Sequence, residues 1–247
     1  MCKTFWQNYT TALGFMTRFG SSRICSNEEI AATMRQFYAV GLTLGCIITL
    51  PFALGLLAAF PLVQAWLWVF LSIWCTRALH WDGWADIWDG WGSCATGDRF
   101  WEIVKDSRVG AFGAIAMVIG ILGQVVLVYE LFVLDAWPVL IFAPIAGRVA
   151  AVGIGGLGDT PSASTQGRLF LQGATPRTII IQTLLAAGTG CLLSGVLPTL
   201  LTGILCTIAL WSFLRLGKQQ GGINGDFLGA TVITGELAAM LGYLLSL

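Results

Sequence analysis

Long apolar stretches alternate with short polar segments along most of the chain. Seven of these stretches are long enough, as helices of about 20 residues, to cross the hydrocarbon core of a bilayer. They lie at residues 37–58, 61–79, 110–132, 138–157, 178–196, 198–215 and 227–246. Pro61 separates the first two stretches and Pro198 the fifth and sixth, so we expect each of these pairs to form a tight hairpin.

The N-terminal segment has a different pattern. Residues 5–19 mix aromatic and aliphatic side chains with polar ones too closely for a span, which is typical of a helix lying along the membrane surface. Ser26 and Glu29 form a capping-box pattern that predicts the start of the next helix. The pattern over residues 1–247 predicts one integral membrane domain. Its fold class is all-α, a polytopic membrane helix bundle of about seven transmembrane helices with an N-terminal interfacial helix.

Composition agrees with a protein that lies in a lipid bilayer. Hydrophobic residues make up 56% of the chain and charged residues 11%, and the mean hydropathy is +0.79. A soluble domain would carry about 25% charged residues. The net charge of zero, without a basic patch, gives no reason to expect a nucleic-acid partner. The seven cysteines are scattered without a Cys-x-x-Cys pair, so neither a disulfide framework nor a zinc site is indicated.

Lysine and arginine are distributed on one side of the predicted spans. They gather in or beside the N-terminal segment 1–36 and the predicted loops 80–109, 158–177 and 216–226. The opposite turns, around Pro61, residues 130–137 and Pro198, have none. The positive-inside rule therefore predicts a multi-pass protein of the cell (inner) membrane, with these loops cytoplasmic and the C-terminus outside.

Two ionisable residues fall inside predicted spans. Arg148 lies within the fourth span and is the exception to the one-sided charge pattern, and Glu236 lies in the seventh. Ionisable residues inside a membrane segment are candidates for function. A buried structural pair between the two is an equally good interpretation.

Three aspartates are concentrated in residues 80–90, which read His-Trp-Asp-Gly-Trp-Ala-Asp-Ile-Trp-Asp-Gly. In a helix, Asp82, Asp86 and Asp89 would share one face within about 60°. Such close carboxylates repel one another unless a cation is present. Hard oxygen ligands of this kind suit Mg²⁺ or Mn²⁺, with phosphate completing the coordination. Gly83 and Gly90 would let an anionic substrate approach the backbone.

The alternative for this stretch is a solvated helix end whose acids happen to be in phase. That interpretation fits poorly, because the same stretch carries tryptophans at positions 81, 84, 88 and 91. They leave no polar face except the aspartates. His80, the only histidine, is either an interfacial structural residue or a candidate catalytic group beside the acids.

Two further segments suit a phosphate group. Ser107, Arg108 and Gly110 precede the third span, where a helix N-terminus with an arginine and little side-chain bulk favours an anion. The second segment leads into the seventh span and contains Gly222, Asn224, Gly225 and Asp226. A glycine-rich turn can be a mere connector, but the aspartate at the mouth of an apolar helix favours a functional role.

Three motifs occur in order along the chain. They are His-x-Asp-Gly-x-Ala-Asp-x-x-Asp-Gly at 80–90, Asp-Ser-Arg-x-Gly-x-x-Gly at 106–113 and Gly-Gly-x-x-Gly-Asp-x-Leu-Gly-Ala at 221–230. With the length and the span pattern, they resemble the cobalamin synthase family, the adenosylcobinamide-GDP ribazoletransferases, over essentially the whole chain. The chain departs from the family pattern at Trp81 and Trp84, where leucines are usual, and at Asn224, where Thr or Ser is usual.

The resemblance implies a Mg²⁺-dependent membrane enzyme of cobalamin biosynthesis. α-Ribazole, or its 5′-phosphate, would attack the cobinamide-linked phosphorus of adenosylcobinamide-GDP. GMP would leave, and a new phosphodiester would complete adenosylcobalamin or its 5′-phosphate. The family's metal ligands correspond to Asp82, Asp86, Asp89 and Asp226, and Asp226 is also a candidate catalytic residue. Homo-oligomerisation and association with other corrinoid-assembly enzymes stay open.

Two other functions can be weighed on the residues themselves. A CDP-alcohol phosphotransferase also uses clustered aspartates on membrane helices, but that family has an arginine after Asp-Gly-x-x-Ala, where this chain has Asp86. A cation transporter would need acids in mid-span, whereas Asp82, Asp89 and Asp226 are all predicted at one membrane face. Acids that hold metal, together with glycine-rich turns, suit phosphoryl transfer best.

Overall fold

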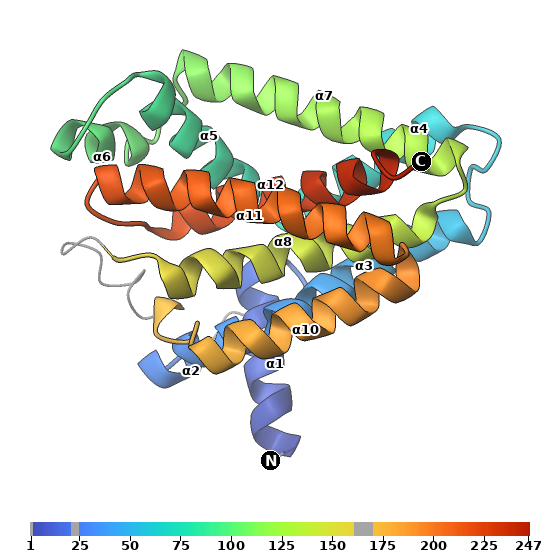
Figure 1. The fold of residues 1–247 in the computed structure, drawn as a ribbon, viewed down its shortest axis with the longest axis horizontal. Coiled ribbons are helices and arrows are strands. Elements are labelled where there is room, and N and C mark those ends of the chain that lie inside the picture. The colour runs from blue at the N-terminus through green and yellow to red at the C-terminus, as the bar shows by residue number, and fades with distance from the viewer. Residues whose placement is uncertain (1, 21–24, 161–169) are drawn as a thin grey trace.

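Helices make up the regular structure of the chain in this computed structural model, which describes residues 2–20, 25–160 and 170–247. No strand occurs in those three ranges. The predicted all-α membrane bundle is thus confirmed (Figure 1). The helices are α1 (Cys2–Met16), α2 (Asn27–Thr33), η1 (Met34–Gln36), α3 (Phe37–Ala53), α4 (Pro61–Cys75), α5 (Leu79–Gly92), α6 (Asp98–Val104), α7 (Ala111–Val133), α8 (Trp137–Leu157), α10 (Pro176–Leu193), α11 (Val196–Gln219) and α12 (Gly225–Leu244).

Six helical segments of the described chain are long and apolar enough to cross a bilayer. They are Asn27–Ala53, Ala111–Val133, Trp137–Leu157, Pro176–Leu193, Val196–Gln219 and Gly225–Leu244. The predicted span 61–79 differs from the structure. Its helix α4 ends at Cys75 after 15 residues, and α5 then turns away by 90°. The bent pair of α4 and α5 is a seventh candidate at most, and α5 itself does not run along the bundle.

The bend between α4 and α5 is made by two residues that are not glycine. Arg77 and Ala78 have φ angles of 55° and 57°, in the left-handed region. This conformation costs roughly 1–2 kcal/mol for a residue with a Cβ atom. The Arg77 side chain compensates in part, because its Nη2 donates to the carbonyls of Gly14 (3.1 Å) and Phe15 (2.9 Å) near the end of α1. The bend is therefore tied to the N-terminal helix.

The region 80–109, predicted as a loop, is mostly helical. It contains α5 and α6, and α5 is packed between α7 and α12. Eight of the 14 residues of α5 are buried, and Trp84 Nε1 donates to the Ala116 carbonyl of α7 at 3.1 Å. Many of its apolar side chains are buried by contacts with other helices, which the sequence pattern does not reveal. The membrane side of this region stays a prediction.

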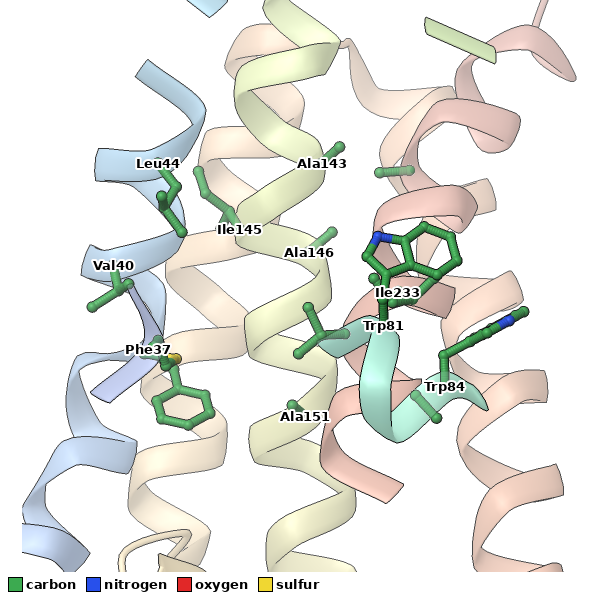
Figure 2. Packing of buried hydrophobic residues seen from close by; sticks show 14 of the residues in the cluster. Phe37, Val40, Leu44, Trp81, Trp84, Ala143, Ile145, Ala146, Ala151 and Ile233 are labelled. Atoms are coloured by element: carbon green, nitrogen blue, oxygen red, sulfur yellow. The ribbon is translucent and has the colours of Figure 1, made fainter. Parts of the chain in front are cut away.

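The core of the bundle forms around α8. In Figure 2, α8 lies in the middle. Helix α3, with Val40 and Leu44, lies on one side of it, and α12, with Ile233, lies on the other side. Glycine lets these helices approach closely, as is common between membrane helices. A Cβ atom at Gly41 of α3 would lie 2.7 Å from the Pro144 carbonyl oxygen of α8. The helices α10 and α11 are mostly exposed, as expected for helices that face lipid.

The two ends of the bundle carry different segments (Figure 1). The turns 54–60, 134–136 and 194–195 lie at one end, together with the C-terminus. The helices α5 and α6 and the N-termini of α7, α10 and α12 lie at the other end, and α1 runs across the bundle axis. The basic segments thus gather at a single end, as the sequence predicts.

The left-handed conformation of Ala78 gives a testable prediction. Because glycine has no Cβ atom, Ala78→Gly relieves the strain and should stabilise the protein by about 1 kcal/mol. Ala78→Val should destabilise it. Thermal unfolding of the purified protein in detergent measures both changes. Ala114→Gly, in the regular helix α7, is the control and should lower stability by about 1 kcal/mol. Equal losses for the two glycine variants would contradict the strained bend.

Candidate active site

The site is built where α5 crosses α12 with their backbones in contact. A Cβ atom at Gly83 of α5 would lie 2.7 Å from the Asp226 carbonyl oxygen and 2.8 Å from its Cα atom. A Cβ atom at Gly229 of α12 would lie 3.3 Å from His80 Cα. This crossing places the first and third sequence motifs side by side. The interpretation of Gly83 as room for a substrate is wrong, because α12 occupies that space. Gly90 likewise makes room for the Phe100 ring.

The carboxylates of four acids interact electrostatically at this crossing. Burial raises the pKa of the Asp86 carboxyl to about 7. Repulsion adds to the shift, in decreasing order, from Asp226, Asp82 and Asp89. The expected grouping of the α5 acids on one face is therefore present, and the acid of the third motif joins them. A cluster that repels itself in this way would be relieved by a bound cation.

Asp89 has a different environment from the other acids of α5. It is buried, and its two carboxylate oxygens accept the backbone N–H groups of Gly110 (2.7 Å) and Gly113 (2.8 Å). These groups lie at the N-terminus of α7, where orphan N–H groups and the helix dipole favour an anion. Asp89 thus anchors α7 to α5. The role of Asp89 as a metal ligand stays a prediction. Gly110 was predicted to bind phosphate, and in the structure its N–H donates to the Asp89 carboxylate.

The arrangement of the acids limits what kind of metal site they can form. Among the described residues, no three His, Cys, Asp or Glu side chains are grouped so as to hold a metal ion by themselves. Mg²⁺ usually takes only one or two protein carboxylates and completes its shell with water and substrate phosphate. Asp82, Asp86 and Asp226 supply hard oxygen donors of that kind, so the donor set fits a substrate-assisted magnesium site.

Asn224 orients Asp226 at the start of α12. Its Oδ1 accepts from the backbone N–H groups of Asp226 (3.2 Å) and Phe227 (3.4 Å), which caps the helix. Its Nδ2 donates to Asp226 Oδ2 at 2.6 Å. The preceding Gly222 has a φ of 144°, which permits the sharp turn into the cap. The glycine-rich segment therefore shapes the site, and its predicted contacts with substrate stay predictions.

A cavity of about 330 Å³ opens beside the acids. Its polar lining includes His80, Asp82, Asn224, Gly225 and Asp226. Its lining also has an aromatic wall, which consists of Phe15, Phe37 and Phe170. Sequence reasoning missed this wall. The only signal was the aromatic content of the N-terminal helix, and nothing in the pattern indicated that it would fold back over the acids.

His80 is enclosed at the inner edge of this cavity. Its Nε2 is buried and has no hydrogen-bond partner among the described residues. Burial lowers the pKa of the imidazole well below its usual value, and the positive charge of Arg148 lowers it further. The ring is therefore neutral at physiological pH and carries one N–H group. The structure thus brings this candidate together with Asp82 and Asp226.

Arg108 does not reach the cavity. Its Nη2 donates to Asp106 Oδ2 (2.8 Å) and its Nε to Asp106 Oδ1 (3.1 Å), with the guanidinium largely exposed. This hydrogen bonding lowers the pKa of Asp106 to about 2. The neighbouring Ser107 is also exposed. A phosphate contact by either residue stays a prediction. To bind phosphate, Arg108 would have to release the Asp106 carboxylate.

The two ionisable residues inside the spans pair with each other. Arg148 of α8 donates to the Glu236 carboxylate of α12, and both side chains are almost fully buried. Gln124 of α7 adds a hydrogen bond to Glu236 Oε2 at 3.0 Å. Of the two interpretations left open by the sequence, the structure shows the buried pair. It ties three spanning helices together beneath the cavity.

Fold and site together define an integral membrane protein with an acidic site at one end of a helix bundle. Residues 8–244 match the family model described as cobalamin-5-phosphate synthase. Because this match covers most of the chain, the chain belongs to the cobalamin-5-phosphate synthase family. No solved structure matches the chain.

Several similar proteins have the name adenosylcobinamide-GDP ribazoletransferase. The protein from Nitratidesulfovibrio vulgaris (strain DSM 19637 / Miyazaki F) is 45% identical over 98% of this chain and 96% of its own length. The one from Shewanella pealeana is 32% identical over 96% of this chain and 95% of its own length. The one from Brevibacillus brevis is 31% identical over 93% and 94%. The suspected family is thus confirmed.

The contrasting surroundings of Asp86 and Asp89 predict opposite effects on stability. Because the pKa of Asp86 is raised from 3.8 to about 7, the folded protein loses stability as the pH rises from about 4 to about 7. Asp86→Asn should therefore stabilise the metal-free protein more at about pH 8 than at about pH 5. Asp89→Asn should destabilise it at both pH values, by about 1–3 kcal/mol, because an N–H of Gly110 or Gly113 loses its acceptor.

Thermal unfolding in detergent with EDTA would measure both variants. A loss of stability in Asp86→Asn that grows with pH would contradict the repulsive cluster. Unchanged stability in Asp89→Asn would contradict its role in anchoring α7.

Proposed function

We propose that this chain is an adenosylcobinamide-GDP ribazoletransferase. It joins adenosylcobinamide-GDP to α-ribazole or α-ribazole 5′-phosphate, and it releases GMP in the last assembly step of cobalamin biosynthesis. The observation that carries the proposal is the presence of Asp82 and Asp226 at one cavity, with Asp86 electrostatically coupled to both, in a chain similar over nearly its full length to proteins of that name. Charge neutralisation and positioning, which such a site supplies, are the main requirements of phosphoryl transfer.

The proposed cofactor is Mg²⁺, held by Asp82, Asp86 and Asp226. Bound there with the substrate diphosphate, it would neutralise negative charge and stabilise the departing GMP. Support comes from the electrostatic coupling of the three acids, which is unfavourable without a cation. In this proposal Asp89 holds the α7 N-terminus in place beside the acids, in addition to any contact with metal.

The chain's own residues account for the acceptor side of the reaction. A ribose hydroxyl of α-ribazole forms the new bond to phosphorus, and the bond to the oxygen of GMP breaks. The hydroxyl proton passes to Asp226, whose Oδ2 is oriented by Asn224. A general base of this kind typically contributes about 10²–10⁴-fold to a rate. Arg108 would contact the diphosphate after releasing Asp106.

A cation transporter fits the structure less well. The acid deepest in the spanning helices that the structure describes, Glu236, is paired with Arg148. The remaining acids of the site lie at one end of the bundle. They do not form a path across it, and a membrane enzyme with a one-sided site is the better explanation.

Catalysis can be tested by following GMP release from adenosylcobinamide-GDP and α-ribazole with the purified protein. The wild type should be active with Mg²⁺ and inactive with EDTA. Asp82→Asn should lose about 100-fold or more and regain part of the rate at high Mg²⁺, as expected for a metal ligand. Asp226→Asn should recover less of its rate at high Mg²⁺ than Asp82→Asn does, because it loses the base as well as a metal ligand. Asp135→Asn, an exposed acid at the other end of the bundle, is the control.

The proposed function would be rejected if the wild type released no GMP at any Mg²⁺ concentration. Wild-type rates in both site variants would reject the assignment of the acids while leaving the activity intact.

We also propose that the α5–α6 end of the bundle faces the cytoplasm from the inner membrane. Support comes from the basic residues gathered at that end. In a cysteine-free background, Thr96→Cys and Lys218→Cys should react with impermeant maleimides only after the inner side of the membrane is opened. Asp135→Cys and Leu247→Cys should react in intact cells. Protection of position 135 in intact cells would contradict this orientation.

A further inference from the structure

The cavity beside the acids has a polar and an apolar lining. The apolar side chains come from α1, α3, α12 and residue 170, namely Phe15, Met16, Phe37, Phe170, Leu228 and Val232. The rings of Phe15 and Phe170 are 4.4 Å apart between centroids and form a continuous surface. A phosphate or another charged group would lose its hydration against this wall without compensation. The apolar lining therefore fits a flat, mainly apolar ring system.

One buried polar atom of the described residues that line the cavity has no hydrogen-bond partner. Five buried side-chain atoms of the described residues lack a hydrogen-bond partner, and His80 Nε2 is the one whose residue lines the cavity. The His80 side chain is only 6% exposed. Because buried polar atoms in folded proteins are nearly always paired, the unpaired nitrogen of a residue that lines a cavity indicates that a ligand completes it. The ligand would then offer this nitrogen a single acceptor or donor atom.

The reactants of the proposed function contain four kinds of ring system that this pattern can distinguish. Guanine has two donor groups and acceptors along its edge, and adenine has an amino group and several ring nitrogens. Either base would leave polar groups unpaired against the aromatic wall. The corrin ring is too large for 330 Å³, which is near the lower limit of ligand pockets. The dimethylbenzimidazole base of α-ribazole has two methyl groups and one free ring nitrogen.

We propose that this cavity binds the benzimidazole base of α-ribazole, with His80 Nε2–H donating to the free ring nitrogen. The inference rests on the proposed function and specifies where its acceptor lies. The base packs against the aromatic wall, and the attached ribose extends toward Asp82 and Asp226. His80 is then a binding residue that selects the acceptor base and aligns its hydroxyl with the acids.

The contribution of the proposed hydrogen bond between His80 and the base can be measured by changing each partner in turn. The ligand change replaces α-ribazole by the ribosyl derivative of 5,6-dimethylindole, which has a carbon in place of the free nitrogen. The protein change is His80→Phe, which keeps a ring but removes the N–H group. We expect the wild type to bind the indole analogue on the order of 10-fold more weakly than α-ribazole. His80→Phe should bind α-ribazole about as weakly and no longer distinguish the two acceptors.

The measurements are equilibrium binding of each acceptor to the purified protein in detergent, and the KM of each substrate in GMP release. Trp88→Phe is the matched control, because it removes another unpartnered ring N–H of α5 that does not line the cavity. It should discriminate between the acceptors as the wild type does. If His80→Phe does not fold, the two acceptors compared on the wild type still test the proposal.

The outcomes separate this inference from the proposed function. A wild type that binds both acceptors equally overturns the inference, even if GMP release is normal. A His80→Phe variant whose KM rises for adenosylcobinamide-GDP and not for α-ribazole shows that the cavity takes the donor substrate, which also overturns it. A wild type that binds α-ribazole with the predicted selectivity but releases no GMP supports the cavity assignment and rejects the transfer reaction.

Discussion

The direct backbone contact between α5 and α12 is the constraint on which the site depends. Gly83 lies against Asp226, and Gly229 against His80, at distances that admit no Cβ atom at Gly83 without a collision. The close contact between α5 and α12 brings Asp82 to the N-terminus of α12, which lies more than 140 residues further along the chain. The partial burial of Asp86 and the repulsion from the nearby carboxylates then raise the pKa of Asp86. A larger residue at Gly83 would separate the two halves of the site.

The position of α5 is held at both of its ends by unusual local interactions. At its start, the left-handed residues Arg77 and Ala78 turn the chain by 90°, and the Arg77 side chain attaches the turn to α1. Near its end, the Asp89 carboxylate caps α7 through two backbone N–H groups. A helix of 14 residues is thereby fixed to α1, α7 and α12. Such support from several elements is what holds catalytic groups in a defined geometry.

The bundle contains one cluster of opposite charges, which neutralise each other, and one cluster of like charges. Arg148 and Glu236 are buried among the spanning helices and neutralise each other, with Gln124 satisfying the second carboxylate oxygen. This arrangement avoids the large free-energy penalty of an isolated charge in an apolar interior. Asp86 and Asp226, in contrast, are close to like charges and have no basic partner among the described residues. An uncompensated acid cluster is destabilising on its own, which is why it indicates a site that acts on a cation and a phosphate.

The sequence by itself determined the helical membrane fold, the collection of basic segments at one end and the shared face of Asp82 and Asp86. These properties depend on hydrophobic length and helical periodicity, which are local. The tertiary structure alone decided the bend at Arg77 and Ala78, because no glycine or proline marks it and long-range contacts offset its strain. It also decided that Asp89 caps α7 and that the aromatic wall closes the cavity. Those features join residues far apart in the chain, and no periodic pattern encodes which distant partners meet.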